Sequence, residues 1–267
     1  MTDHRHIVQA AQYLVQRYEA KESLDIMLQP FAPTTIEEAY QVQEAFLELL
    51  GQSKGALGGY KIAYTSDEMR RLRGIRSPCA GGIFASTMQD SPATFRATDY
   101  VRLAIECEVA AKMGADVPAS KAPYSRASIA DYVECLSVAF EMVDLRGAAA
   151  GAGQDAAAIA GICTNIANAG AVFGSAVRDW RRIDLAASHG VMLINGEEVG
   201  KGLGADVMGH PLEPLVWLVN MLAERGKELT AGTTVITGSI IPPKPIGAGD
   251  TATIAIDGLG EARVSVL

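Results

Sequence analysis

One stretch in the first half of the chain alternates between apolar and mostly polar side chains over residues 101–112. With the two-residue period of a β-strand, these side chains separate onto two faces. One face carries Val101, Leu103, Ile105, Cys107, Val109 and Ala111. The other face carries Arg102, Ala104, Glu106, Glu108, Ala110 and Lys112. The stretch therefore predicts a β-strand with an apolar back and two carboxylates on its front.

The two carboxylates, Glu106 and Glu108, allow two interpretations. In a strand their Cα atoms would lie roughly 6.5–7 Å apart, so both side chains could converge on one ion. At about 5 Å and an effective dielectric near 20 they would repel by roughly 3 kcal/mol, which a divalent cation would reverse. The other interpretation is a solvated edge strand, with Arg102 and Lys112 as surface partners. On this stretch alone we favour the solvated edge, because charged residues are usually exposed.

The composition limits the class of protein. A length of 267 residues allows one large domain, or one domain with a smaller appendage. The hydrophobic fraction of 49% predicts a globular chain with a sizeable core. A net charge of −8, without a run of Lys or Arg, argues against nucleic acid or an anionic membrane as a partner. Because residues 1–7 have no apolar signal core and no run of about 18 apolar residues appears, we expect a cytoplasmic protein.

The cysteines give no sign of a metal knuckle. Cys79, Cys107, Cys135 and Cys163 form no Cys-x-x-Cys pair, which argues against structural zinc. In a reducing compartment we expect four free thiols, mostly buried.

Helical patterns dominate the beginning of the chain. Apolar residues recur at helical spacing over residues 7–20. A second helix is predicted from capping-box pairs at residues 34–38 to a break at Gly51. We therefore expect a helical N-terminal subdomain over residues 1–75 and a β-rich domain over residues 76–267.

The rest of the chain mixes strands and helices. Helices are predicted at residues 128–135 and 211–225, and the Gly/Ala-rich residues 147–161 form a connection. Strands are predicted at residues 60–65, 101–112, 136–145, 191–199, 233–238, 251–256 and 261–267. The pair Asn195-Gly196 is a strong hairpin signal. Strand clusters joined by hairpins and long loops, with helices between them, predict an α+β fold.

Two further residues extend the pattern of the carboxylate strand. Glu141 stands among apolar neighbours in the predicted strand 136–145. Three carboxylates without a nearby His or Cys pair would suit a hard cation such as Mg²⁺ or Mn²⁺. Lys61, in the short strand 60–65, is either a surface lysine or the cation that balances the third negative charge.

These residues belong to a set of motifs that occur in order along the chain. They are Gly-Tyr-Lys-Ile-Ala-Tyr-Thr-Ser (59–66), Ile-Glu-Cys-Glu-Val (105–109), Phe-Glu-Met-Val-Asp-Leu-Arg (140–146), Gly-Leu-Gly-Ala-Asp-Val-Met-Gly-His-Pro (202–211), and Thr-Gly-Ser-Ile-Ile-Pro (237–242) with Ala-Gly-Asp (248–250). With them the chain resembles the 2-keto-4-pentenoate hydratase and 2-oxo-acid decarboxylase family, within the fumarylacetoacetate hydrolase superfamily. The resemblance covers nearly the whole length and implies a mixed β-roll or barrel with flanking helices.

The resemblance also implies a site. Its members would be a catalytic lysine, Lys61, and a metal held by Glu106, Glu108 and Glu141. The metal, Mg²⁺ or Mn²⁺, would chelate the 2-oxo and carboxylate oxygens of a small acid and act as a Lewis acid. Substrate contacts are expected from Ser66, Asn165 and Ser239. A homo-oligomer is expected as well.

The expected reaction is hydration of a short unsaturated 2-oxo acid, a 2-hydroxydienoate of the kind formed in meta-cleavage of aromatic compounds. Ser239 resembles the hydratase branch, because decarboxylase relatives tend to carry a second glycine there. The alternatives are decarboxylation of a 2-oxo-enedioic acid and hydrolysis of an acylpyruvate-type diketo acid. A further alternative is a non-catalytic relative that binds a small acid.

One position departs from the family pattern. Where hydratases have an aspartate after a proline, this chain has Cys79 in Ser-Pro-Cys-Ala-Gly. A thiol with a pKa near 8.5 is a poor substitute for a carboxylate at neutral pH. Cys79 is therefore either a catalytic thiol or a small residue that fills a loop.

Overall fold

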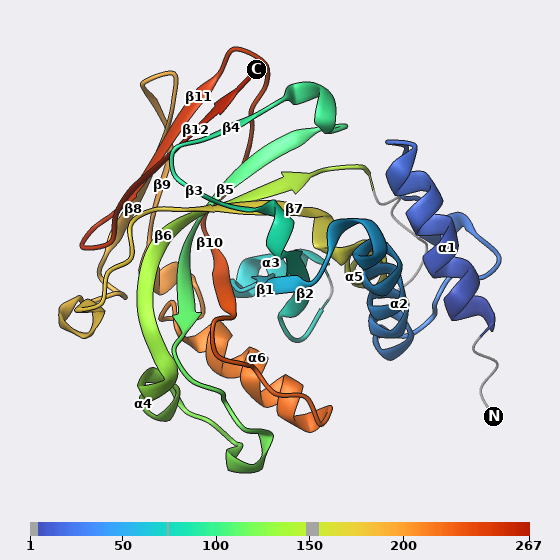
Figure 1. Ribbon diagram of the computed structural model, residues 1–267, viewed down its shortest axis with the longest axis horizontal. Coiled ribbons are helices and arrows are strands. Elements are labelled where there is room, and N and C mark those ends of the chain that lie inside the picture. Colours follow the sequence, from blue (N-terminus) through green and yellow to red (C-terminus); the bar gives the residue numbers. More distant parts are fainter. Residues whose placement is uncertain (1–4, 74, 148–154) are drawn as a thin grey trace.

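The centre of the molecule is a seven-stranded sheet, seen in a computed structural model that describes residues 5–73, 75–147 and 155–267 (Figure 1). In spatial order its strands are β2 (Cys79–Phe84), β1 (Leu57–Ala63), β10 (Thr234–Pro245), β5 (Leu103–Met113), β6 (Val133–Asp144), β7 (Asn168–Phe173) and β3 (Met88–Asp90). The predicted carboxylate strand is β5, which pairs antiparallel with both β10 and β6. The expectation of a solvated edge strand is therefore wrong, because hydrogen-bonded neighbours cover both of its edges.

A second sheet packs on the apolar back of β5 and contains five strands. In spatial order they are β4 (Ala93–Phe95), β12 (Gly260–Val266), β11 (Thr251–Ile256), β8 (His189–Ile194) and β9 (Glu197–Leu203). The predicted hairpin at Asn195-Gly196 is confirmed, since these residues join β8 to β9. Ile105 and Cys107 of β5 are fully buried against this second sheet, in one core with Met192 and Ile254.

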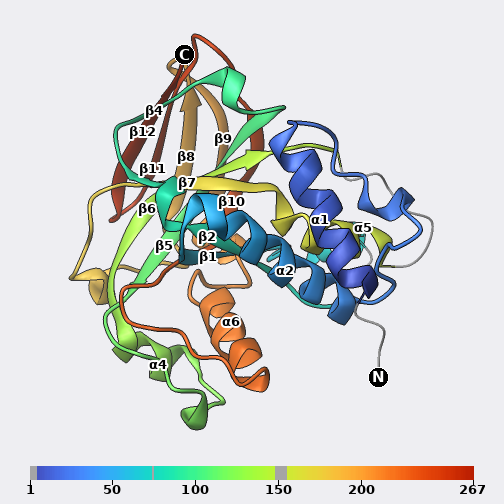
Figure 2. The same ribbon diagram turned by 45° about the vertical axis from the view of Figure 1, so that its right-hand side comes forward.

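The helices α1 (Arg5–Glu19) and α2 (Ile36–Lys54) form a layer on the side of the larger sheet away from the second sheet (Figure 2). Thr35 caps α2 by accepting a hydrogen bond from the backbone N–H of Glu38. The predicted break at Gly51 is wrong. A glycine inside a helix costs only about 1 kcal/mol relative to alanine, and α2 continues to Gly55, whose positive φ ends it.

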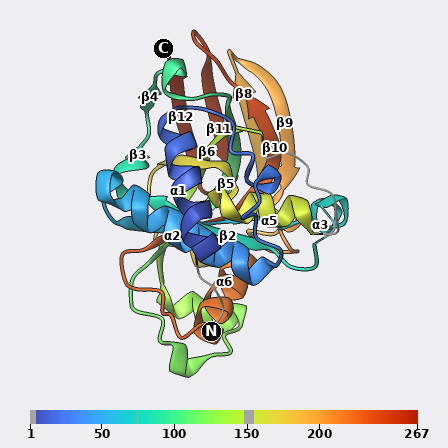
Figure 3. The same ribbon diagram turned by 90° about the vertical axis from the view of Figure 1, so that its right-hand side faces the viewer.

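The described part of the chain contains four more α-helices: α3 (Asp67–Arg73), α4 (Arg126–Ile129), α5 (Ala156–Cys163) and α6 (Glu213–Glu224). The helix predicted at residues 128–135 is wrong in its second half, because pairing of β6 with β5 begins at Val133. The predicted connection at 147–161 contains the start of α5, and residues 148–154 lie outside the described residues. In Figure 3, α1 and α2 face the viewer, and their apolar faces share a core with α5.

The larger sheet crosses the predicted domain boundary at residue 75. Strand β1 precedes that position, yet it pairs with β10 and β2 in the middle of the fold. The division into residues 1–75 and 76–267 stays a prediction. The predicted α+β class is confirmed, and no helix in the described part of the chain is long and apolar enough to span a membrane.

The larger sheet is strongly curled. Asn165 closes it, because its side chain bonds to both backbone groups of Gly82 in β2. Asn165 lies three residues before the start of β7, which is next to the last strand at the other end of the sheet's strand order. Inside the resulting roll, apolar side chains from five strands form a separate core: Ile83, Ala110, Ala139, Ala171 and Ile236. Part of the roll's interior is therefore apolar, and the front face of β5 points into the roll.

Candidate active site

Three carboxylates meet inside the roll. Glu106 of β5 lies directly opposite Glu141 of β6, and Glu108 follows on the same face of β5. One oxygen from each of the three lies within 4.8 Å of the others. Glu108 and Glu141 are completely buried. The cluster predicted from the family resemblance is therefore brought together by strand register.

Lys61 reaches the same cluster from β1. Its Nζ forms an ion pair with Oε2 of Glu141 over 3.2 Å, and the lysine side chain is only 3% exposed. In the strand order, β1 is three strands away from β6. In a flat sheet three strand spacings would separate the backbones by about 14 Å, so the contact depends on the curl of the sheet.

Backbone and amide groups fix the two buried carboxylates. The backbone N–H of Gly238 donates to Oε2 of Glu108 at 2.7 Å. The side-chain amide of Asn168 donates to Oε1 of Glu141 at 2.9 Å. Oε1 of Glu108 has no hydrogen-bond partner among the described residues. A buried carboxylate oxygen without a partner is energetically costly unless a cation binds it.

The electrostatics of the cluster also favour binding of a cation. Burial and the charge of Glu141 raise the pKa of Glu106 to about 7 and that of Glu108 well above its usual range. Burial alone would lower the pKa of Lys61, but the nearby carboxylates of Glu141, Glu106 and Glu108 raise it. Lys61 therefore stays protonated, and when all three carboxylates are ionised it balances one of their three negative charges. The remaining two match the charge of a divalent cation, so these residues fit a metal such as Mg²⁺ or Mn²⁺.

A cavity of about 680 Å³ opens onto the cluster and is lined by Lys61, Glu106, Ser66 and Ser239. Its volume lies within the usual range for small-molecule sites. The Ser239 hydroxyl donates to the carbonyl of Ile241. Ser66 caps α3, accepting a hydrogen bond from the N–H of Met69 at 3.2 Å. Both serines line this cavity, and their contacts with a substrate stay predictions.

The wall of this cavity also contains a buried ion pair. Nε of Arg146 lies 2.7 Å from Oδ2 of Asp144, the last residue of β6. The guanidinium stacks on Tyr18 and donates to its backbone carbonyl. The pair therefore ties the end of the Glu141 strand to the helical layer.

Two predicted site residues lie elsewhere. Of the described residues that line the cavity, none is Cys79 or Asn165. The Cys79 thiol is buried beside Tyr40, and burial raises its pKa to about 12. Asn165 uses both ends of its amide on the backbone of Gly82. The roles predicted for these two side chains stay predictions, and their contacts in this structure are with the protein.

Sequence reasoning missed Asn168 and Gly238. An asparagine at the start of a strand belongs to no recognisable sequence motif, so the contact of Asn168 with Glu141 could not be predicted from the sequence. Gly238 lies inside a recognised motif, but only its φ of +109° reveals why glycine stands there. A Cβ on Gly238 would lie 2.5 Å from Oγ1 of Thr65.

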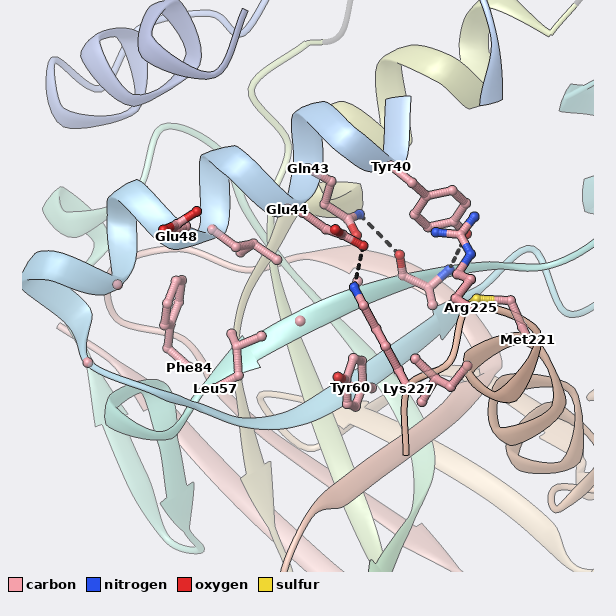
Figure 4. A pocket seen from close by; sticks show the side chains of 17 residues that line it. Tyr40, Gln43, Glu44, Glu48, Leu57, Tyr60, Phe84, Met221, Arg225 and Lys227 are labelled. Carbon is pink, nitrogen blue, oxygen red and sulfur yellow. Dashed lines mark hydrogen bonds and ion pairs between the residues drawn. The ribbon is translucent and has the colours of Figure 1, made fainter. Parts of the chain in front are cut away.

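A second cavity, of about 380 Å³, lies between α2, β1, β2 and the end of α6 (Figure 4). Tyr60, the neighbour of Lys61 in β1, lines it from the other face of the strand. Lys227 pairs with Glu44 over 2.5 Å, and Arg225 stacks on Tyr40. Because none of the described residues lining it belongs to the carboxylate cluster, we place the candidate active site in the larger cavity.

The fold and the site define a class of protein, and sequence comparison agrees. The family model for the fumarylacetoacetate (FAA) hydrolase C-terminal domain matches residues 83–267, and the chain belongs to this family. The predicted superfamily and fold are therefore confirmed.

Among individual relatives, 2-hydroxyhexa-2,4-dienoate hydratase of Comamonas testosteroni is 27% identical over 267 residues, covering 99% of this chain and 98% of that protein. A 4-oxalocrotonate decarboxylase of Pseudomonas putida is 37% identical over 99 residues, which is 37% of this chain and 38% of that protein. In structure, 4-oxalocrotonate decarboxylase from Pseudomonas putida G7, complexed with magnesium and adipate, superposes with a TM-score of 0.89 at 23% identity. That match covers 100% of this chain and 99% of the other, and it shows the shared fold.

Proposed function

We propose that this protein is a metal-dependent lyase that hydrates a short unsaturated 2-oxo acid, entering as its 2-hydroxydienoate. The observation that carries the proposal is the buried cluster of Glu106, Glu108 and Glu141 with Lys61, two of whose members, Lys61 and Glu106, line a cavity. A hydratase-named relative that matches almost the entire chain supports the choice of reaction.

In this proposal the three carboxylates hold a divalent ion, Mg²⁺ or Mn²⁺. When bound, the ion supplies Lewis-acid stabilisation of negative charge on the oxygens of a 2-oxo acid. Hydration adds a proton to one carbon and a hydroxyl group to another across a C=C bond. Lys61, which stays protonated, supplies a fixed positive charge and N–H donors beside the carboxylates. Ser66 and Ser239 supply hydroxyl groups to the bound acid.

Hydration also requires a proton to move at the far end of the substrate. Cys79 was predicted there, and its raised pKa leaves the thiol protonated at neutral pH, so it can act only as an acid. Its side chain would have to reach the cavity to do so. We therefore propose Lys61, rather than Cys79, as the principal catalytic residue.

The direct test is turnover of 2-hydroxypenta-2,4-dienoate by the purified protein after removal of metal with EDTA and addition of Mg²⁺. Loss of dienol absorbance only when Mg²⁺ is present is the expected result. Glu106→Gln serves as the matched variant, because it keeps the shape of the side chain and removes one ligand charge. A complete lack of turnover on short 2-hydroxydienoates, with metal bound, would reject the proposal.

A second candidate is decarboxylation of a 2-oxo-enedioic acid. It is favoured by the similarity to decarboxylases in a segment of sequence and in fold. Release of CO₂ from such a substrate, without hydration of the monocarboxylic dienoate, would select it. Absence of both activities from a protein that binds a small acid would instead indicate a non-catalytic relative.

A further inference from the structure

The segment between α5 and β7 has an unusual backbone. Asn165, Ile166 and Ala167 have φ values of 54°, 49° and 58°, so three consecutive residues other than glycine adopt the left-handed conformation. Such conformations are unfavourable for L-residues, and most of all for β-branched Ile166. Strained backbone of this kind persists only where surrounding contacts hold it, and it is concentrated at functional sites.

Asn165 holds this turn in place. Its Oδ1 accepts a hydrogen bond from the backbone N–H of Gly82 at 2.8 Å, and its Nδ2 donates to the carbonyl of Gly82 at 2.8 Å. The approach is so close that a Cβ on neighbouring Gly81 would lie 2.6 Å from Oδ1 of Asn165. Asn165 therefore satisfies outward-facing backbone groups of β2 and anchors the turn to the roll at the same time.

The turn ends at Asn168, whose side chain reaches the carboxylate cluster. Asn168 lies opposite Val143 in β6, but a register shift between Met142 and Val143 brings its amide to Glu141. Such irregularities in strand pairing commonly redirect a side chain next to a functional site. Because a carboxylate oxygen only accepts hydrogen bonds, the nitrogen of the amide must face Oε1 of Glu141, at 2.9 Å.

The contact with Asn168 determines which oxygen of Glu141 faces the cluster. Asn168 occupies Oε1, while Oε2 faces Lys61. Glu141 is fully buried and has little alternative solvation. Without the amide, the carboxylate could rotate about its last torsion and turn either oxygen toward the cluster. Partners that orient a ligand in this way usually affect metal affinity strongly.

We infer that Asn168 is a positioning residue that fixes Glu141 for metal binding, and that the strained turn anchored by Asn165 serves to aim Asn168. The inference rests on the proposed metal-dependent function. Asn168 has no substrate contact in this scheme. Its effect is exerted through the orientation of one carboxylate.

Titration of the metal-free full-length protein with Mn²⁺, followed by electron paramagnetic resonance of free and bound ion, tests the inference without an activity assay. The parent chain is expected to bind one Mn²⁺. Asn168→Ala should bind it roughly 10–100-fold more weakly, with an altered spectrum of the bound ion. Asn165→Ala, which releases the turn, should also weaken binding. Ala167→Gly is the matched control, because glycine keeps the left-handed backbone and leaves Asn168 in place.

The outcomes separate the two proposals. Failure of the parent to bind Mn²⁺ would reject the metal-dependent function itself. A parent that binds Mn²⁺, together with an Asn168→Ala variant of equal affinity and unchanged spectrum, would overturn the positioning role. So would an equal loss of affinity in Ala167→Gly, because it would point to general disturbance of the turn. If Asn168→Ala does not fold, Asn168→Leu removes the same donor with nearly the same side-chain size.

Discussion

Lys61 Nζ lies 3.2 Å from Oε2 of Glu141, and the two side chains are 3% and 0% exposed. The pair joins β1 to β6 across the interior of the roll. Glu106 and Glu108 leave this interior with an excess of negative charge. Lys61 therefore carries the only positive charge that the described residues place in contact with the cluster. Its removal should lower both the stability of the fold and the activity.

Lys61→Met should destabilise the metal-free protein strongly. Methionine fills similar space, but Glu141 loses its counter-charge in a buried site, and breaking such a pair typically costs about 3–5 kcal/mol. Urea unfolding in EDTA measures the change. Added Mg²⁺ should recover part of the loss, since ligand binding to the folded state stabilises it. Turnover of the proposed dienoate should fall to background.

Lys112→Met is the matched control for this prediction. Lys112 is half exposed near the end of β5, and its Nζ lies 4.0 Å from Oε2 of Glu134. Exposed pairs of this kind contribute about 0–1 kcal/mol. Equal destabilisation by the two substitutions would show that the Lys61 pair has no special role.

Glu108→Gln should stabilise the metal-free protein while weakening metal binding. Its carboxylate is fully buried within 4.8 Å of the other two, and when it is ionised the like charges repel by roughly 3 kcal/mol at an effective dielectric near 20. The neutral amide removes that repulsion, and its oxygen can still accept from Gly238. We expect unfolding in EDTA at pH 8 to become harder by about 1–3 kcal/mol.

The same substitution should abolish the stabilisation that Mg²⁺ gives to the parent. Glu198→Gln, at an exposed position 4.0 Å from Lys201, controls for a general effect of losing one charge. If Glu108→Gln proved less stable than the parent in EDTA, the cluster would be held together by interactions other than those described. Opposite signs for stability and metal affinity are typical of sites built for function.

The alternation of residues 101–112 was enough to place Glu106 and Glu108 on one face of a strand. It could not give their burial, because that depends on β10 and β6 pairing with both edges of β5. The proximity of Glu141 and Lys61 came from family resemblance. Their contact depends on the curl of a sheet whose strands are far apart in sequence, and local pattern carries no information about that.

The residues that orient the cluster were even harder to predict from the sequence. Asn168 reaches Glu141 through a left-handed turn and a register shift, and Gly238 reaches Glu108 through a positive φ. Each depends on backbone geometry that tertiary contacts impose. A glycine or asparagine in the sequence allows such backbone geometry, but its presence alone does not predict that geometry.

Cys79 should be unreactive in the native protein. With its pKa raised to about 12 by burial, only about one thiol in a thousand would be ionised at pH 9, whereas an ordinary thiol would be mostly thiolate. Its alkylation by iodoacetamide should therefore stay slow from pH 7 to pH 9 and become fast in urea. Mass spectrometry of the Cys79 peptide measures both rates. Native alkylation as fast as that of a free thiol would contradict the buried position.

The residue at 238 gives the most discriminating test of backbone geometry. Gly238→Ala would force a Cβ to within 2.5 Å of Oγ1 and 2.6 Å of Cγ2 of Thr65, at a φ of +109° that L-residues rarely adopt. The backbone would have to shift, which would also move the N–H that holds Glu108. We expect a loss of about 2–5 kcal/mol, combining strain with overpacking, together with weaker Mn²⁺ binding.

Gly249→Ala separates the two causes of that loss. Gly249 also has a positive φ, of +91°, but its added Cβ would meet no atom of the described residues within 4 Å. It should therefore show the conformational strain alone, about 1–3 kcal/mol, with unchanged Mn²⁺ affinity. Urea unfolding and Mn²⁺ titration of both variants give the comparison. If both variants changed Mn²⁺ affinity equally, the clash between Thr65 and a Cβ at residue 238 would not affect the position of Glu108. If only Gly238→Ala lost affinity, the position of the Glu108 carboxylate would depend on residue 238 having no Cβ.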